Sequence, residues 1–248
     1  MKKNSKFSRE ILNILLKRTK VTDKSELISN TKLTKRHKIR VLGEHNRLFI
    51  SDNFNIKSCN INIQGKNNIV ILDENIKGNH LKIEVNGNNN TITIEKDIII
   101  YGSLSISHNN FGDNCSLRIG KSTSFFVTDI HLYDTGSSIS IGEDCMFSKN
   151  TTIYHSDGHA ILENGNIVNQ AQSLSIGNHV WVGWDCTILK NSNIPNGCII
   201  GRAALVSGKF YEENCVLAGI PAKQIKSNII WDRKTVNELL IDYKKQDK

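Results

Sequence analysis

Two histidines, His155 and His159, are the residues of this chain best suited to acid–base chemistry. They flank Ser156, Asp157 and Gly158 at the start of a polar stretch. An unperturbed imidazole titrates near pH ~6.5, so either ring could remove a proton from a hydroxyl group as that group attacks an electrophile. Asp157 is a candidate to orient His159 or to bind a substrate, and it is equally suited to an Asx turn.

A second candidate segment has the sequence HVWVGW, residues 179–184. Trp181 follows Ile176 by five residues, a place that faces outward in the repeat described next, so its indole is not simply part of a core. Trp184 offers an aromatic face on which a sugar ring could stack. Both tryptophans are therefore candidate binding residues.

The element that positions these residues is a six-residue ladder of aliphatic side chains between residues 176 and 210. Neither a helix nor an isolated hairpin requires this period, whereas a β-helix does, because each flat face of a coil is about six residues long. Four residues after each aliphatic position stands a small residue that also points inward. The ladder predicts a three-sided prism with coils of roughly 18 residues. The aliphatic positions are Ile176, Val182, Ile188, Ile194, Ile200 and Val206, and the small ones are Val180, Cys186, Ser192, Cys198 and Ala204.

A longer repeat of 22 residues precedes the ladder, with corners of the type Gly-x-x-Asn at Gly43, Gly65 and Gly87. Gly and Asn tolerate the positive φ that tight corners demand. The pattern restarts less regularly at Gly112 and Gly136 and stops at Tyr154. It resumes at Leu174, so the polar residues 155–173 form a loop that leaves the prism and is expected to be functional.

Three regions follow from these patterns: a basic N-terminal helix and linker over 1–38, a parallel β-helix over 39–227 and a helical extension over 228–248. Residues 1–40 hold a net charge of +10, within a chain of net charge +8. Helical spacing in the first 20 residues predicts an amphipathic helix that either packs on a neighbouring subunit or makes weak contact with a membrane surface or an anionic glycan. A second helix over 235–246 is expected to cover the open end of the prism or a neighbour.

The six cysteines and the hydropathy pattern indicate the compartment. Five cysteines occupy small inward places of the repeat, where they act as small hydrophobic residues. Unpaired buried thiols fit a reducing cytoplasm. The sequence shows neither a run of 18 apolar residues nor a signal peptide. We therefore expect a cytoplasmic protein, with the inner face of the membrane as a place where the basic arm could bind.

The ladder resembles the hexapeptide-repeat acyltransferases. The segments HVWVGWDCTILK, NIPNGCIIGRAALVSGKF and VLAGIPAKQIK are similar to the last coils and the closing turn of that family. The resemblance covers residues 39–227 and implies an all-β, left-handed parallel β-helix. Within the family, the chain is most similar to the O-acetyltransferases of capsular and other surface polysaccharides, including those that act on polysialic acid.

The resemblance also implies roles for individual residues. His159 matches the catalytic histidine of the family, Trp181 matches a tryptophan that shapes the acetyl site, and the backbone N–H of Trp184 would stabilise the oxyanion. Acetyl-CoA would lie in a groove between two prisms of a homotrimer. The residues expected along that groove are Gly201, Arg202, Ala203, Ala204, Ser207, Lys209 and Lys223.

The predicted function is therefore acetyl transfer from acetyl-CoA to a carbohydrate hydroxyl, on a surface polysaccharide, in one direct step and with no metal required. One alternative is an N-acetyltransferase acting on a nucleotide-linked amino sugar. A second is a zinc enzyme resembling the β-helical carbonic anhydrases, because His131, His155, His159 and His179 could supply ligands. A third is a non-catalytic basic adaptor. Binding of nucleic acid is not expected, because the repeats carry no basic stripe and no interleaved aromatic platform.

Overall fold

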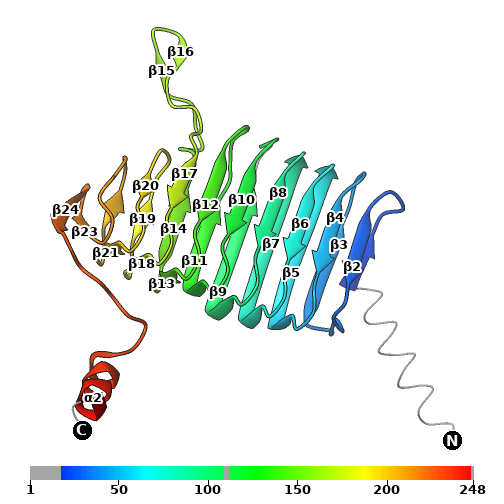
Figure 1. Ribbon diagram of the computed structural model, residues 1–248. Helices are drawn as coiled ribbons and strands as arrows, with labels where there is room; N and C mark the ends of the chain where they lie inside the picture. Colours follow the sequence, from blue (N-terminus) through cyan, green and yellow to red (C-terminus); the bar gives the residue numbers. More distant parts are fainter. Residues whose placement is uncertain (1–17, 109–111, 247–248) are drawn as a thin grey trace, which may run out of the picture.

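The computed structural model describes residues 18–108 and 112–246, which form a parallel β-solenoid followed by a helix (Figure 1). Nearly all strand pairs are parallel and join one coil to the next. The 14-stranded sheet contains β1 Thr19–Val21, β3 His37–Val41, β5 Asn55–Lys66, β7 Lys77–Asn88, β9 Ile99–His108, β11 Ser124–His131, β13 Met146–Phe147, β14 Thr151–Tyr154, β18 Trp181–Val182, β19 Thr187–Ile188, β21 Ile199–Ile200, β22 Leu205–Val206, β23 Val216–Gly219 and β24 Ala222–Lys226. The eight-stranded sheet contains β2 Glu26–Ser29, β4 Arg47–Ile50, β6 Ile69–Leu72, β8 Thr91–Ile94, β10 Ser116–Ile119, β12 Ser138–Ile141, β17 Leu174–Ile176 and β20 Asn193–Ile194.

The C-terminal coils have three distinct faces. The eight-stranded sheet forms the first face, β13, β18 and β21 form the second, and β14, β19 and β22 form the third. In the N-terminal coils the second and third faces are continuous, because each long strand pairs along its whole length with the next. The strand β11 joins the two arrangements, since it pairs with both β13 and β14.

The six-residue ladder forms the core of the last coils, as predicted. Every aliphatic ladder residue from Ile176 to Val206 is buried, and so are the small residues four positions later. Each short strand places one side chain inward and one outward, and the burial patterns alternate accordingly. The apolar core is continuous along the solenoid, from Ile39 to Ala222.

The corners of the N-terminal coils depend on glycine and asparagine. Gly65 has a φ of 104°, and a Cβ at this position would lie 1.9 Å from the carbonyl oxygen of Gly87. Inside the same corner, Asn46, Asn68 and Asn90 are buried and stacked. The amide of Asn68 donates to the side-chain oxygen of Asn46, and the amide of Asn90 donates to that of Asn68. These hydrogen bonds satisfy polar groups that would otherwise be buried without partners.

The solenoid begins one coil earlier than the predicted boundary at residue 39. The strand β1 pairs with β3 and β2 pairs with β4, so residues 19–36 form a coil and not a linker. Their apolar side chains, such as Val21 and Leu27, are only partly buried, because this coil is the first in the described part of the stack. Most of the predicted N-terminal amphipathic helix falls on residues 1–17, outside the described part of the chain. At its expected end the prediction is wrong, because Thr19 and Lys20 lie on the strand β1.

Two segments leave the solenoid (Figure 1). The loop 155–173 projects beyond the coils and carries a short hairpin, β15 Leu162–Glu163 and β16 Asn166–Ile167. At the C-terminal end, β24 folds back antiparallel on β23. The helix α2, Val236–Gln246, confirms the predicted helix, but it stands away from the coils and does not cover the open end of its own prism.

Candidate active site

The two candidate bases differ sharply in accessibility. His155 follows β14 and is fully buried, with its Nδ1 hydrogen-bonded to the hydroxyl of Ser137. Its carbonyl oxygen accepts from the backbone N–H of Gln172 at 3.0 Å, which closes the neck of the loop. His159 lies four residues further on and is exposed. A substrate can therefore reach the imidazole of His159 but not that of His155.

His159 lines a cavity of about 360 Å³ at the base of the loop. The walls come from the turn Asp134–Gly136 on one side and from Asn169 and Gln170 of the returning loop on the other. The side chain of Asn169 donates to the carbonyl oxygen of His159 at 2.8 Å, which fixes the backbone that carries the imidazole. This cavity has the size of a small binding site with a titratable group at its wall.

Asp157 anchors the loop and does not contact the imidazole of His159. Its Oδ2 accepts from Lys190 Nζ at 2.7 Å and from Asn169 Nδ2 at 2.8 Å. Lys190 also donates to the carbonyl oxygens of Asn169 and Gln170, so one ammonium group joins both sides of the loop to the third face. The hydrogen bonds from Lys190 and Asn169 lower the pKa of Asp157, which keeps the carboxylate charged.

Trp181 lies on β18, on the second face of the prism, and is partly buried. Its indole N–H donates to the hydroxyl of Ser148 at 3.3 Å. Trp181 lines no part of the cavity around His159, which lies where the third face turns into the first. A single chain therefore does not bring these two predicted site residues together.

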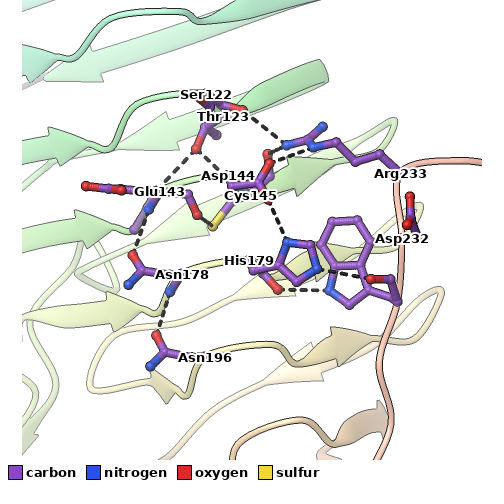
Figure 2. A network of polar contacts seen from close by, with 12 residues as sticks. Ser122, Thr123, Glu143, Asp144, Cys145, Asn178, His179, Asn196, Asp232 and Arg233 are labelled. Atoms are coloured by element: carbon purple, nitrogen blue, oxygen red, sulfur yellow. Dashed lines mark hydrogen bonds and ion pairs between the residues drawn. The ribbon is translucent and has the colours of Figure 1, made fainter.

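Beside Trp181, the segment 227–235 crosses the edge of the second face; we name it the strap. Its residue Trp231 lies with its ring centroid 6.1 Å from that of Trp181. Trp231 also stacks on His179, whose Nδ1 lies 2.7 Å from Asp144 Oδ2 (Figure 2). Arg233 donates to the other oxygen of Asp144 at 2.7 Å, to Ser124 and to two backbone carbonyls. The strap is thus held by hydrogen bonds and stacking at the edge that carries Trp181.

The predicted cofactor residues divide among two corners of the prism and the end of the solenoid. Trp184, Gly201, Arg202 and Ala203 lie at the corner between the second and third faces, where the guanidinium of Arg202 is 5.7 Å from the centroid of the exposed Trp184 ring. The N–H of Ala203 donates to the carbonyl of Trp184, which joins the two coils. Ala204 is buried, so it could meet a cofactor only through its backbone.

The remaining predicted cofactor residues lie elsewhere. Ser207 follows β22 at the corner between the third and first faces. Lys209 lines a second cavity of about 710 Å³, which shares Gly136 and Ala171 with the cavity around His159. Lys223 is exposed on β24, at the end of the solenoid. The structure therefore brings Lys209 to the side of the prism that carries His159, and it separates both from Arg202 and Lys223.

The four histidines considered as zinc ligands have separate surroundings. His131 stacks on both Tyr133 and Tyr154, while His155 and His179 have the partners given above. In the described residues no three His, Cys, Asp or Glu side chains gather as a metal site. Within residues 18–108 and 112–246, no helix has the length and apolar character that a membrane crossing requires.

Sequence reasoning missed four residues that shape these sites. Lys190 and Asn169 fix the loop, and Trp231 and Arg233 fix the strap. A single polar residue in a repeat or a loop carries no signal of its partner. Trp231 was the exception, because its sequence context did carry a signal. An isolated tryptophan in a polar C-terminal segment of an aromatic-poor chain indicates a docking contact.

The comparisons with known proteins agree with the fold. A polysialic acid O-acetyltransferase of Neisseria meningitidis is 36% identical over 217 residues, 87% of this chain and 88% of the relative. A polysialic acid O-acetyltransferase of Escherichia coli O1:K1 is 34% identical over 110 residues, 44% of this chain and 36% of the relative. The crystal structure of the polySia-specific acetyltransferase NeuO superimposes with a TM-score of 0.62 at 25% identity and covers 90% of this chain and 88% of that one. No family model matches the chain.

The solenoid and these relatives define the class as the hexapeptide-repeat acyltransferases, with the left-handed parallel β-helix that the family resemblance implied. Within that class, the chain belongs to the family of the polysialic acid O-acetyltransferases. The predictions of an all-β solenoid and of an O-acetyltransferase enzyme are therefore confirmed.

Proposed function

We propose that the protein transfers an acetyl group from acetyl-CoA to a hydroxyl of a surface polysaccharide or of its sugar units, with His159 as the general base. The observation that carries this proposal is the exposure of His159 in a cavity at the loop base, while His155 is buried. Two relatives are named polysialic acid O-acetyltransferases, and these names support a carbohydrate acceptor.

The reaction needs few groups. The Nε2 or Nδ1 lone pair of His159 takes the proton of the sugar hydroxyl while its oxygen attacks the thioester carbonyl carbon. The tetrahedral oxyanion that forms accepts a hydrogen bond from the backbone N–H of Trp184. As the carbonyl re-forms, the carbon–sulfur bond breaks, and the imidazolium returns its proton to the leaving thiolate. The products are the acetyl ester and free coenzyme A.

The active site in this proposal is shared between neighbouring subunits of a homotrimer. This sharing is supported by the separation of His159 from Trp181 and Trp184 within one chain. In one prism the proposed base lies at one corner and the proposed acetyl site lies on another face. Two prisms placed side by side bring such surfaces together, and flat faces suit cyclic packing.

Coenzyme A would lie along the groove between two such prisms. The backbone of Gly201, Ala203, Ala204 and Ser207 would line the pantetheine, and the exposed cations of Arg202, Lys209 and Lys223 would meet its phosphates. Arg202 is available for this role because its side chain is exposed beside Trp184 and its ion pair with Asp185 is at the surface. A cytoplasmic location would supply acetyl-CoA, and the basic residues 1–20 would allow weak membrane-surface association.

The experiment is an assay of acetyl transfer to polysialic acid and to other capsular glycans, with His159→Ala beside the wild type. Loss of the base is expected to lower kcat by about 100- to 10,000-fold, with an unchanged unfolding temperature because the side chain is exposed. His45→Asn is the matched control, since His45 is also an exposed histidine on a corner and asparagine tolerates its φ of 56°. Wild-type activity in His159→Ala would remove the proposed base.

The chemical nature of the product separates the two candidate acyl acceptors. An acetyl ester is released by hydroxylamine or mild alkali, whereas an acetamide is stable to both. Release of the label under these conditions is expected, and a stable product would favour an N-acetyltransferase.

A further inference from the structure

The turn of the hairpin in the loop 155–173 is an Asn-Gly dipeptide that the proposed transfer reaction does not use. Asn164 and Gly165 join β15 to β16, and their φ angles are 50° and 81°. Two consecutive positive φ values are typical of a type I′ turn, which Asn-Gly favours. The hairpin projects away from the coils, so this turn lies at an exposed tip (Figure 1).

The turn leaves the reactive groups of this dipeptide open. After an asparagine, the backbone nitrogen of the next residue can attack the side-chain carbonyl carbon, and glycine places no Cβ in its way. Within the described residues, neither the side chain of Asn164 nor the N–H of Gly165 has a hydrogen-bond partner. A Cβ added at Gly165 would meet nothing within 4 Å, so the surroundings of that nitrogen are also open.

The hairpin is free to change its conformation. Residues 157–168 are all exposed, and only two residue pairs join the two strands of the hairpin. Its loop is tied to the third face at its base, through Lys190. A two-stranded hairpin is at best marginally stable in water, so the turn opens often enough for the nitrogen to reach the side chain.

The chain contains two further Asn-Gly dipeptides, and the solenoid holds both of them. The Nδ2 of Asn196 donates to Glu213 at 2.7 Å, and its Oδ1 accepts from the backbone N–H of Asn178 at 2.7 Å. The N–H of Gly197 donates to the carbonyl oxygen of Asn178 at 2.9 Å. Both reactive groups are therefore occupied at this corner.

The other dipeptide, Asn86 and Gly87, is held by the sheet. Both residues lie on β7, which pairs with β5 on this stretch. A Cβ added at Gly87 would lie 2.3 Å from the carbonyl oxygen of Gly112, so backbone of the next coil crowds this glycine. A reaction between the two residues would require the coils to separate, and core strands open far more rarely than exposed loops.

We infer that Asn164 is a site of covalent modification, at which the folded protein converts asparagine to aspartate and isoaspartate without an enzyme. The nitrogen of Gly165 forms a bond to Cγ of Asn164, and the Cγ–Nδ2 bond breaks. The amide proton of Gly165 leaves with the Nδ2 group as ammonia, and a cyclic imide remains. Water then opens the ring. Addition at Cγ gives aspartate in a normal main chain, and addition at the main-chain carbonyl carbon gives isoaspartate.

The modification changes the tip of the loop and not the groups that hold its base. It adds a negative charge beside Glu163, on a tip that also exposes the apolar side chains of Ile161 and Leu162. The isoaspartate form adds a methylene group to the main chain of the turn, which disturbs the pairing of β15 with β16. The inference does not depend on the proposed function, because the reaction needs only the turn and water.

The experiment follows the folded, full-length protein in mildly alkaline buffer at physiological temperature, with mass spectrometry of its peptides at intervals. Asn164 is expected to deamidate at least about tenfold faster than Asn86 and Asn196 in the same molecules, with isoaspartate among the products. In urea the three dipeptides should react at similar rates, because the fold no longer distinguishes them. Asn166, which is also exposed but is followed by Ile167, should remain an amide.

Gly165→Ala is the matched variant. It keeps Asn164 and the exposure of the turn but places a methyl group beside the attacking nitrogen, so deamidation should slow by about tenfold or more. Equal rates at the three dipeptides of the folded protein would overturn the inference, and so would a rate difference that persists in urea. Ammonia released without isoaspartate, or an unchanged rate in Gly165→Ala, would also overturn it, because both results indicate direct hydrolysis of the side-chain amide.

Discussion

The indole of Trp231 stacks on the imidazole of His179, with ring centroids 4.0 Å apart and planes inclined by 10°. Two hydrogen bonds complete the pair, from Trp231 Nε1 to the carbonyl of His179 at 2.8 Å and from His179 Nε2 to the carbonyl of Trp231 at 3.1 Å. Because His179 is two residues before Trp181, the pair holds the strap beside the predicted acetyl site.

Removal of this stacking should free the strap. Trp231→Ala is expected to expose the strap to trypsin at Arg233 and Lys234 and to lower acetyl transfer by up to about 100-fold, because Trp181 loses its aromatic neighbour and shifts. The measurements are the rate of cleavage and kcat. Ile230→Ala is the control, since Ile230 is 93% exposed and should change neither quantity. If trypsin cleaved Trp231→Ala no faster than the wild type, Arg233 alone would be sufficient to hold the strap.

Acid should also release the strap. Partial burial disfavours the charge on Asp144, but the hydrogen bonds and charges of Arg233 and His179 outweigh burial and lower its pKa below the usual 3.8. The ionised carboxylate is thus favoured while the strap is docked. Its contribution to the free energy of docking is fully present above pH 3.8 and is lost as the pH falls through the lowered pKa. Tryptophan fluorescence followed over acid pH should report this loss.

The control for the acid transition is Asp144→Asn, which removes the titrating carboxyl. Its fluorescence should not change in the same acid range. A transition that persists in this variant would assign the effect to another carboxyl group. Asp232→Asn, a change at an exposed neighbour on the strap, should keep the transition of the wild type.

Lys190 should control the loop that carries His159. Its ammonium joins Asp157 to the carbonyls of Asn169 and Gln170, and its side chain is only 18% exposed. Lys190→Ala is expected to speed thermolysin cleavage at the exposed apolar residues Ile161 and Leu162 and to lower kcat by about tenfold to 100-fold. Lys57→Ala, on a distant strand, should leave both unchanged. A loop that resists cleavage without Lys190 would show that Asn169 alone suffices to hold it.

The sequence predicted those parts of the structure that repeat. The period from Ile176 to Val206 was sufficient to place an inward side chain on each face of two consecutive coils, because one spacing rule applies to every coil. The first described coil was not predicted, because its few apolar residues, such as Val21 and Leu27, do not make a recognisable repeat. The position of the loop followed from the interruption after Tyr154.

Contacts between distant segments could not be predicted in the same way. Arg233 meets Ser124 across 109 residues and Asp144 across 89, and nothing periodic links these positions. Asp157 was predicted to orient His159 or to bind substrate, yet its carboxylate faces Lys190, 33 residues later. The three faces of the prism separate residues that are close in sequence, so no pattern in one chain could predict whether the proposed site unites His159 with Trp181 of a neighbouring subunit.

The corner at Gly65 provides a matched test of the solenoid itself. An alanine Cβ at Gly65 would lie 1.9 Å from the carbonyl oxygen of Gly87, and φ is 104°, whereas Gly165 in the loop hairpin has a φ of 81° and nothing within 4 Å. Gly165→Ala should cost only about 1 kcal/mol of local backbone strain. Gly65→Ala adds a clash that only separation of two coils relieves, so we expect a loss of at least about 3 kcal/mol in urea unfolding. Equal stability of the two variants would contradict the close stacking of backbone at this corner.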